Sequence, residues 1–299
     1  MSSTKYTTIS QSAQVSFSKT MKTFDYSIEE IHSTLVTSLR DFFAKCGQKR
    51  AVLGLSGGID SAVVAALAVE AFGKENVCGI MMPSQFSTVH SLTDAVDLAN
   101  NLDMEYMVIP IEKMYMRAMR DLEPLFKGDD SWDNTQENIQ ARIRGMIVMA
   151  YSNRHGALAL NTSNKSELAM GYGTLYGDLA GALMVIADIY KIQVYDLARY
   201  INRDRTIIPI STITKAPSAE LRHDQKDTDT LPDYAVLDPV LHALIEEGKT
   251  KEELIAEGED EALIDRILTL KARSAFKIHQ MAPVIKVSEK PIHYSQKWV

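Results

Sequence analysis

The segment Gly54-Leu-Ser-Gly-Gly-Ile-Asp-Ser61 has the composition of a loop that binds phosphate. It follows a short apolar run at residues 50–54 and precedes a strongly apolar stretch of helical length. Two adjacent glycines remove side chains where backbone N–H groups must approach a ligand, and the serine hydroxyls add donors. A helix that begins here also contributes free N–H groups and the positive end of its dipole. The segment therefore predicts a phosphate site.

Asp60 would repel phosphate unless a cation lay between them. The loop does not end in Gly-Lys-Ser/Thr, so no lysine of the Walker type reaches a terminal phosphate. A divalent cation resolves the repulsion, and carboxylate and phosphate oxygens favour Mg2+. A tight turn in which Asp60 only caps the helix is the structural explanation of the same residues. The match of the whole loop between strand and helix favours phosphate binding.

A second polar segment, Asn161-Thr-Ser-Asn-Lys-Ser-Glu167, follows an apolar run at residues 157–160. In an open parallel sheet the carboxyl ends of the strands face one crevice, so this segment is expected near the phosphate loop. Glu167 can complete the Mg2+ site with Asp60. Thr162 and Lys165 can contact the nucleotide. Helix capping by Ser163 and Glu167 explains the segment equally well when it is taken alone.

Short apolar strands alternate with amphipathic or apolar helices along the first two thirds of the chain. This alternation is typical of an α/β fold with an open parallel sheet and helices on both faces. The predicted strands cover residues 50–54, 76–82, 105–109, 157–160 and about 206–210. The predicted helices cover residues 28–46, 60–72, 91–102 with Ser91 as its cap, 111–126, 134–155 and 191–203.

The chain is expected to form a single domain over residues 1–299, because 299 residues with 45% hydrophobic content can build one large core. Residues 1–23 form a polar N-terminal arm. Residues 214–233 are rich in Pro, Asp and Lys and predict a mobile loop at the active site. Residues 234–299 form a helical C-terminal part with breaks at Gly248 and Gly258.

Composition argues against several classes of function. The net charge is −7 and the basic residues are scattered, which is unlike a nucleic-acid-binding surface. No apolar run reaches the roughly 18 residues of a membrane span, and the N-terminus lacks a secretory signal, so a cytoplasmic location is expected. Cys46 and Cys78 stand far apart among apolar residues and predict buried, reduced thiols without zinc.

Several motifs together resemble the NAD synthetases, a family of the ATP pyrophosphatase superfamily. The phosphate loop is common to that superfamily, whereas the other motifs are specific to NAD synthetases and extend the resemblance over nearly the whole chain. These motifs are Asn138-Ile-Gln-Ala-Arg142, Asn164-Lys-Ser-Glu167, Gly171-Tyr-Gly-Thr-Leu-Tyr-Gly-Asp178, Lys215-Ala-Pro-Ser-Ala-Glu-Leu221 and Asp233-Tyr-Ala-Val-Leu-Asp238.

The resemblance implies an adenine nucleotide alpha-hydrolase-like, Rossmann-like fold and a defined reaction. The family amidates nicotinic acid adenine dinucleotide (deamido-NAD) to NAD through an NAD-adenylate, consuming ATP and ammonia and releasing AMP and pyrophosphate. Its members are homodimers with substrate sites at the subunit interface. The helix from Ile139 to Tyr151, with Ile143, Met146, Ile147 and Ala150, can supply that interface, although burial in the core explains it equally well.

The resemblance also implies roles for individual residues. Ser56, Asp60 and Asp178 are implied to be catalytic, with Asp178 holding or deprotonating ammonium, and Asp60 and Glu167 to bind Mg2+. The implied ATP site comprises Gly54, Leu55, Ser56, Gly57, Gly58, Ile59, Asp60, Ser61, Thr162, Lys191 and Ser218. The implied deamido-NAD site comprises Arg142, Leu175, Ala182, Phe276 and Lys277.

Some of these positions depart from the family pattern or have simpler explanations. Leu175 stands where some ammonia-dependent members have lysine, and Phe276 replaces a His or Tyr. Structurally, Asp178 can be a turn residue and Lys191 a surface lysine. Arg142 can be a solvated helix charge, like Arg144. The loop that the family closes over the nucleotide corresponds to residues 217–233, with Lys215 and residues 220–226 expected near phosphates.

The chain is expected to be of the ammonia-dependent type without a glutaminase domain, because no Glu-Lys-Cys set of a nitrilase-like glutaminase surrounds Cys46 or Cys78. A separate glutaminase stays open as the source of ammonia. Two other functions were weighed: a tRNA-modifying ATP pyrophosphatase, and a non-catalytic adenine-nucleotide sensor. The acidic charge argues against the first, and the Asp60 and Glu167 pair against the second.

Overall fold

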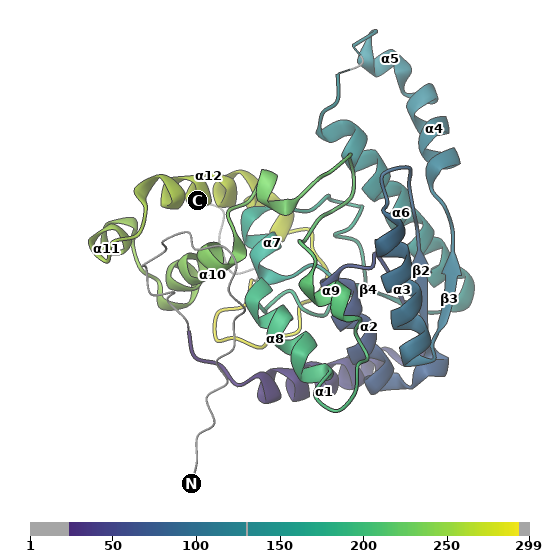
Figure 1. Ribbon diagram of the computed structural model, residues 1–299, viewed down its shortest axis with the longest axis horizontal. Helices are drawn as coiled ribbons and strands as arrows, with labels where there is room; N and C mark the ends of the chain where they lie inside the picture. The colour runs from purple at the N-terminus through teal and green to yellow at the C-terminus, as the bar shows by residue number, and fades with distance from the viewer. Residues whose placement is uncertain (1–23, 130, 293–299) are drawn as a thin grey trace.

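A five-stranded parallel sheet lies at the centre of the computed structural model, which describes residues 24–129 and 131–292 (Figure 1). The strand order is β3-β2-β1-β4-β5, so the chain builds outward from β1 in both directions. The strands are β1 (Ala51–Gly54), β2 (Val77–Met81), β3 (Glu105–Val108), β4 (Leu158–Asn161) and β5 (Leu183–Met184). Every pairing is parallel, which confirms the predicted open parallel sheet. The order reverses between β1 and β4, and ligands of such sheets bind at this position.

Helices cover both faces of the sheet, as predicted. On one face, Leu53 packs in a core with α1 (Ile28–Cys46), α2 (Ile59–Phe72), α3 (Val89–Leu102) and α8 (Lys191–Ile201). On the other face, Val52 packs with α4 (Glu112–Asp121) and α6 (Asn134–His155). Because successive strand residues point to opposite faces, β1 anchors both layers and fixes the phosphate loop that follows it.

The remaining helices form a second core beside the sheet. That core joins α7, α10, the π-helical turn and α12 to the C-terminal segment. Their bounds are α7 (Lys165–Met170), α10 (Tyr234–His242), a π-helical turn (Ala243–Glu247), α11 (Lys251–Ala256) and α12 (Glu261–Ile278). Shorter pieces are α5 (Glu123–Phe126), α9 (Ile210–Thr214) and two 3-10 turns (Lys74–Asn76 and Asp227–Asp229). The predicted helix breaks at Gly248 and Gly258 are confirmed.

The prediction of a fifth strand at residues 206–210 is wrong. The side-chain amide of Asn202 binds the backbone of this segment. Its Oδ1 accepts from Ile207 N (2.9 Å) and Ile208 N (2.8 Å), and its Nδ2 donates to Ile208 O (2.7 Å). These groups are therefore unavailable to a sheet, and α9 begins at Ile210. The fifth strand is Leu183–Met184, a very short piece that follows the glycine-rich loop.

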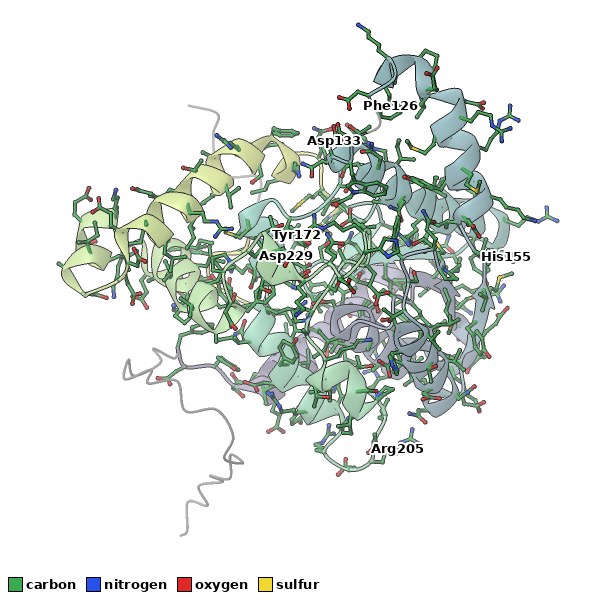
Figure 2. All side chains as sticks on the ribbon, turned by 45° about the horizontal axis from the view of Figure 1, so that its top comes forward. Phe126, Asp133, His155, Tyr172, Arg205 and Asp229 are labelled. Carbon is green, nitrogen blue, oxygen red and sulfur yellow. The ribbon has the colours of Figure 1, made fainter. Side chains whose placement is uncertain are left out.

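Smaller corrections concern helix ends and one cysteine. Thr88 rather than Ser91 caps α3, and its hydroxyl accepts from Ser91 N at 3.1 Å. The helix predicted at 111–126 is split at Leu122, because Pro124 has no N–H to donate to the carbonyl four residues earlier and is tolerated only in the first turn of a new helix. Figure 2 shows the resulting α4–α5 projection, with Phe126 at its tip and Arg205 on the opposite side of the molecule. Cys78 is buried as predicted, whereas Cys46 is exposed.

The N-terminal arm predicted for residues 1–23 lies outside the described residues, as do residues 293–299 of the predicted C-terminal part. Within the described residues, no helix combines the length and apolar character that crossing a membrane requires.

Candidate active site

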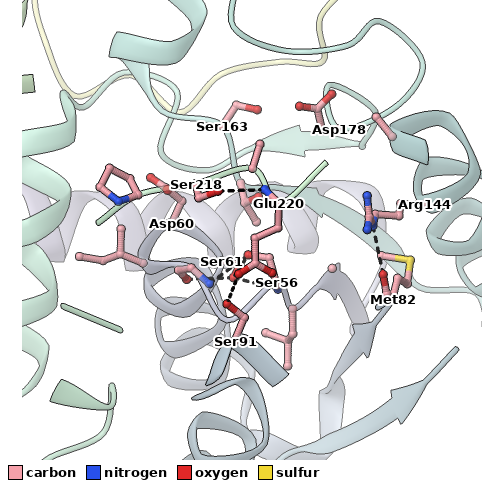
Figure 3. A pocket seen from close by; sticks show the side chains of 18 of the residues that line it. Ser56, Asp60, Ser61, Met82, Ser91, Arg144, Ser163, Asp178, Ser218 and Glu220 are labelled. Atoms are coloured by element: carbon pink, nitrogen blue, oxygen red, sulfur yellow. Dashed lines mark hydrogen bonds between the residues drawn. The ribbon is translucent and has the colours of Figure 1, made fainter. Parts of the chain in front are cut away.

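A cavity of about 330 Å³ opens at the carboxyl ends of β1 and β4. Its walls are the phosphate loop, the segment after β4, one face of α6 and the loop at residues 214–233. Figure 3 shows Ser56 and Ser61 in the middle of this space, with Asp60 to one side and Arg144 and Asp178 to the other. The volume is within the range of small-molecule sites.

The phosphate loop has the geometry that its sequence predicts. The Ser56 and Ser61 hydroxyls lie 3.0 Å apart, and Gly58 N donates to Ser56 Oγ at 3.1 Å. Helix α2 begins at Ile59 with Gly58 as its N-cap, and no side chain caps it. Asp60 is therefore not the cap, so the structural explanation of that residue fails. The uncapped N–H groups at the start of α2 are available to an anion.

Gly57 is required by the close approach of this loop to α3. Its φ is +78°, and a Cβ there would lie 2.1 Å from the backbone oxygen of Ser91. We expect Gly57→Ala to cost at least about 2 kcal/mol of unfolding free energy and to abolish binding of a non-hydrolysable ATP analogue. Gly128→Ala is the matched control, because its φ is +80° but a Cβ would contact nothing within 4 Å. If urea unfolding gave the same loss of unfolding free energy for Gly57→Ala and Gly128→Ala, the proposed clash with Ser91 would be contradicted.

Asp60 and Glu167 lie close together beside the loop, as their predicted shared site requires, and Lys191 lies between them. Lys191 Nζ lies 2.5 Å from Asp60 Oδ2 and 3.3 Å from Glu167 Oε1. The Lys191 side chain is 2% exposed, so its explanation as a surface lysine is wrong. Burial opposes its charge, but the two carboxylates outweigh burial and raise the pKa of Lys191. Burial and the nearby Asp60 carboxylate raise the pKa of Glu167.

Asn164 holds both carboxylates and was not singled out from the sequence. Its Nδ2 donates to Asp60 Oδ1 at 2.8 Å, and its Oδ1 accepts from Glu167 N at 3.0 Å. Its own backbone N–H donates to Glu167 Oε2 at 3.3 Å, which closes a capping box at the start of α7. Helix capping thus does occupy Glu167, with Asn164 rather than Ser163 as the cap. The other carboxylate oxygen of Glu167 faces Lys191.

Lys165 does not contact the nucleotide site, contrary to the prediction. Its side chain is fully buried and points away from the cavity toward Asp188, at 2.8 Å, and Glu246. Ser288 Oγ (2.9 Å) and Lys290 O (3.0 Å) also accept from it. The residues of the Asn-Lys-Ser-Glu motif therefore have two different roles. Glu167 faces the cavity, and Lys165 fixes α7 to the C-terminal segment.

Asp178 lies on the cavity wall with its carboxylate turned toward the interior (Figure 3). Its Oδ1 accepts from Thr174 N at 2.6 Å, which closes the turn and agrees with its structural explanation. Asp178 is accessible from the open cavity, but desolvation by the surrounding protein atoms raises the pKa of its carboxyl. Lys277 steadies this turn, because its Nζ donates to Gly171 O (2.8 Å) and Gly173 O (2.7 Å).

Residues predicted for deamido-NAD are only partly brought together. Arg142 is exposed, donates to Leu175 O at 3.2 Å, and lines a second, shallow cavity with Leu175. Ala182, Phe276 and Lys277 line neither this cavity nor the one that contains the phosphate loop. Their predicted contacts with the substrate stay predictions.

The loop at residues 214–233 covers part of the cavity and is docked on α3 and α6. Glu220 Oε1 accepts from Ser91 Oγ (2.6 Å) and Thr88 Oγ1 (2.9 Å), and Gln140 Nε2 donates to Leu221 O (2.8 Å). Ser218 lines the cavity, although its hydroxyl donates to Gln225 O within the loop. Thr162 and the phosphate loop line the same space. Tyr172 OH donates to Asp227 Oδ1 at 3.4 Å, so this loop meets the segment after α7.

The residue that sequence reasoning missed most clearly is Arg144. Its interpretation as a solvated helix charge is wrong, because it lines the main cavity and donates from Nε to Met82 O at 3.1 Å. The available signal is helical spacing: Ala141, Gly145 and Val148 share its face of α6 and also line the cavity.

The sequence profile of the NAD synthase family matches residues 31–281. The chain belongs to the NAD synthase family. This membership confirms the predicted resemblance to the NAD synthetases at the level of the family.

Relatives within the NAD synthase family differ in their nitrogen donor and substrate. A glutamine-dependent NAD(+) synthetase from Synechocystis sp. is 50% identical over 262 residues, covering 88% of this chain and 47% of that protein. The NH3-dependent NAD synthetase structure from Campylobacter jejuni is 32% identical with a TM-score of 0.69, covering 85% of this chain and 96% of that one. The NMN synthetase structure from Francisella tularensis is 30% identical with a TM-score of 0.72, covering 89% and 99%.

The chain spans about half the length of the curated family members that it matches, 47% of one and 45% of another. Those two relatives are named glutamine-dependent. The expected type, ammonia-dependent without a glutaminase domain, is therefore not confirmed and stays a prediction.

Proposed function

We propose that the chain catalyses the ATP-dependent amidation of deamido-NAD to NAD. First, a nicotinate carboxylate oxygen attacks the α-phosphorus of ATP, the bond to the bridging oxygen breaks, and pyrophosphate leaves with the electron pair. Then ammonia attacks the carbonyl carbon of the adenylate and loses a proton, and AMP departs. The observation that carries the proposal is that one cavity joins the Ser56–Ser61 loop, the Asp60 and Glu167 pair, and Asp178.

The phosphate side of the cavity fits ATP and Mg2+. The loop and the start of α2 provide donors for pyrophosphate. Asp60 and Glu167 would hold Mg2+, since both already contact one cationic group, the Lys191 ammonium. Among the described residues no cluster of three or more His, Cys, Asp or Glu side chains could hold a metal, so phosphate oxygens and water must complete the shell, as is usual for Mg2+. When bound, Mg2+ supplies positive charge that stabilises the departing pyrophosphate.

The other side of the cavity fits amide formation. Ammonium predominates at neutral pH, but only ammonia is nucleophilic, so a carboxylate must recruit the cation and accept its proton. Asp178 is a carboxylate in a suitable position, because its Oδ1 accepts from Thr174 N and its side chain faces the cavity. The raised pKa of Asp178 makes it a stronger base than an ordinary aspartate, which suits that proton transfer.

Ammonia is the proposed direct nucleophile. Neither cysteine lines the cavity: Cys46 is exposed at the end of α1, and Cys78 is buried in the core beneath α6. The described residues thus offer no thiol for glutamine hydrolysis at this site. Ammonia can arrive free or from a glutaminase activity elsewhere.

A direct assay tests the function. The purified chain is incubated with deamido-NAD, ATP and Mg2+, with either ammonium or glutamine, and NAD, AMP and pyrophosphate are quantified by chromatography. We expect all three products in equal amounts with ammonium and little NAD with glutamine. A parallel reaction replaces deamido-NAD by nicotinate mononucleotide, because a similar structure is named an NMN synthetase. Exclusive use of the mononucleotide, or no amide product, would contradict the proposal.

The proposal includes a homodimer formed through the outer face of α6. Ile143 and Ile147 of this helix are buried against the sheet, whereas Met146 (56%) and Met149 (38%) are exposed. These methionines border the shallow cavity that contains Arg142, so a second copy docking here would also cover that predicted substrate residue. Light scattering of the purified chain measures the mass that decides between monomer and dimer.

A further inference from the structure

Arg144 places a cation on the cavity wall that forms no ion pair with any described residue, although the Asp178 and Glu220 carboxylates act on it from a distance. Its Nε donates to the backbone oxygen of Met82 at 3.1 Å, at the carboxyl end of β2. Within residues 24–129 and 131–292, no ion pair or hydrogen bond involves its terminal nitrogens, and neither nitrogen is sealed from solvent. Burial lowers the pKa of Arg144 to about 10, so the guanidinium remains charged at neutral pH. A partly buried charge without an ion pair is costly, and a bound anion would remove this cost.

Close packing holds Arg144 in this position. A Cβ on Gly145 would lie 2.8 Å from Gly177 O, and a Cβ on Gly177 would lie 2.9 Å from the Cβ of Ala141. Helix α6 therefore lies directly against the turn that carries Asp178. Arg144 and Asp178 occupy the same side of the cavity, opposite Asp60 (Figure 3). The contacts that hold α6 against this turn involve glycine and alanine backbone atoms, so flexible side chains do not set the positions of Arg144 and Asp178.

The proposed reaction requires a cation on this side. Its first step brings the nicotinate carboxylate onto the α-phosphate, so two anions must approach within bonding distance. Lys191 is already paired with Asp60 and Glu167 beside the phosphate loop, which the proposed reaction assigns to the departing pyrophosphate. The carbonyl that receives ammonia must lie near Asp178, and the reacting α-phosphate lies between these two groups. Of the other cations on the cavity wall, Lys191 is paired with Asp60 and Lys215 with Asp94, so Arg144 is the one left for this position among the described residues.

We infer that Arg144 is a catalytic residue whose terminal nitrogens contact the α-phosphate of ATP and stabilise its charge while the adenylate forms. The inference rests on the proposed function and deepens it. The planar fork of a guanidinium can donate two parallel hydrogen bonds to a phosphate, which a lysine ammonium cannot reproduce. The bond from Nε to Met82 O leaves both terminal nitrogens available for this contact.

The experiment measures the first half-reaction alone. Pyrophosphate release is followed after rapid mixing of enzyme, ATP, Mg2+ and deamido-NAD without ammonia, for wild type, Arg144→Ala and Arg144→Lys. We expect Arg144→Ala to release pyrophosphate about 100-fold more slowly, as for loss of one preorganised charge-stabilising donor, and Arg144→Lys about 10-fold more slowly. Arg154→Ala is the matched control, since Arg154 is exposed in the last turn of the same helix.

Chemical rescue separates catalysis from structural support. Millimolar guanidinium ion can occupy the space left in Arg144→Ala, and we expect it to restore pyrophosphate release at least 10-fold, whereas urea, its neutral analogue, should restore nothing. Rescue by urea, or wild-type pyrophosphate release by Arg144→Ala, would overturn the assignment. A variant that shows no rescue but has the wild-type unfolding midpoint would also overturn it. If wild type itself releases no pyrophosphate, the proposed function fails instead.

Discussion

Asp60→Asn is expected to lower the rate of adenylate formation by about a thousandfold. This loss corresponds to several kcal/mol of transition-state stabilisation, the size expected when a metal-binding carboxylate is neutralised. The substitution is nearly isosteric, so the contact from Asn164 Nδ2 can persist with the new amide oxygen as acceptor. What disappears is the charge that faces Lys191 and would hold Mg2+.

Pyrophosphate release without ammonia measures this effect, together with the Mg2+ concentration that gives half the maximal rate. The matched control is Asp97→Asn, because Asp97 is exposed on α3 and does not line the cavity. Its rate should equal that of wild type. An Asp60→Asn enzyme that forms adenylate at a wild-type rate and with a wild-type Mg2+ requirement would remove Asp60 from the site.

Asp178→Asn should separate the two half-reactions. Adenylate formation should stay within a few fold of wild type, whereas amide formation should fall by about a hundred- to a thousandfold, as for loss of a general base. The asparagine side-chain oxygen can still accept from Thr174 N, so the turn is preserved. Rapid quenching after addition of ammonium to preformed adenylate measures the second step. The NAD-adenylate should then persist in this variant, whereas wild type should convert it to NAD.

The pH dependence gives a second readout for Asp178. Because its surroundings raise its pKa, the carboxylate is protonated over a wider acidic range than an ordinary aspartate, whose pKa is about 3.9. The protonated form cannot accept a proton from ammonium, so amidation by wild type should rise with pH through the raised pKa of Asp178. This acidic limb should be missing in Asp178→Asn. Unchanged amidation kinetics in the variant would contradict the assigned role.

The phosphate loop was predictable because its chemistry is local. A strand, two glycines, two hydroxyls and a helix start lie within one short segment, so their mutual geometry follows from their order. Glu167 was predictable for a related reason, since parallel strands end at one edge of the sheet. The resemblance to a family placed Lys191 in the ATP site, but its contact with Asp60 was not predicted, because no periodicity joins residues so far apart.

The failures have a different origin. Arg142 and Arg144 are two positions apart, so they lie on different sides of α6 and enter different cavities. Only the docking of α6 against Gly177 decides which arginine faces the phosphate loop, and one helix does not contain that information. The run Ile207-Ile208 has the composition of a strand, but its backbone N–H groups donate to the side chain of Asn202 and not to a neighbouring strand.

The buried Lys165 side chain also makes the position of α7 depend on residues that are synthesised much later. Its partners Ser288 and Lys290 are more than a hundred residues downstream, and Asp188 accepts from the backbone N–H groups of Val287 and Ser288. The edge strand β5 likewise bridges to Val284. Domains generally fold as their chain is synthesised, starting from the N-terminal side. Here the helix that presents Glu167 gains its Lys165 contacts only after residues near 290 have left the ribosome, so the active site is completed only once these residues are synthesised.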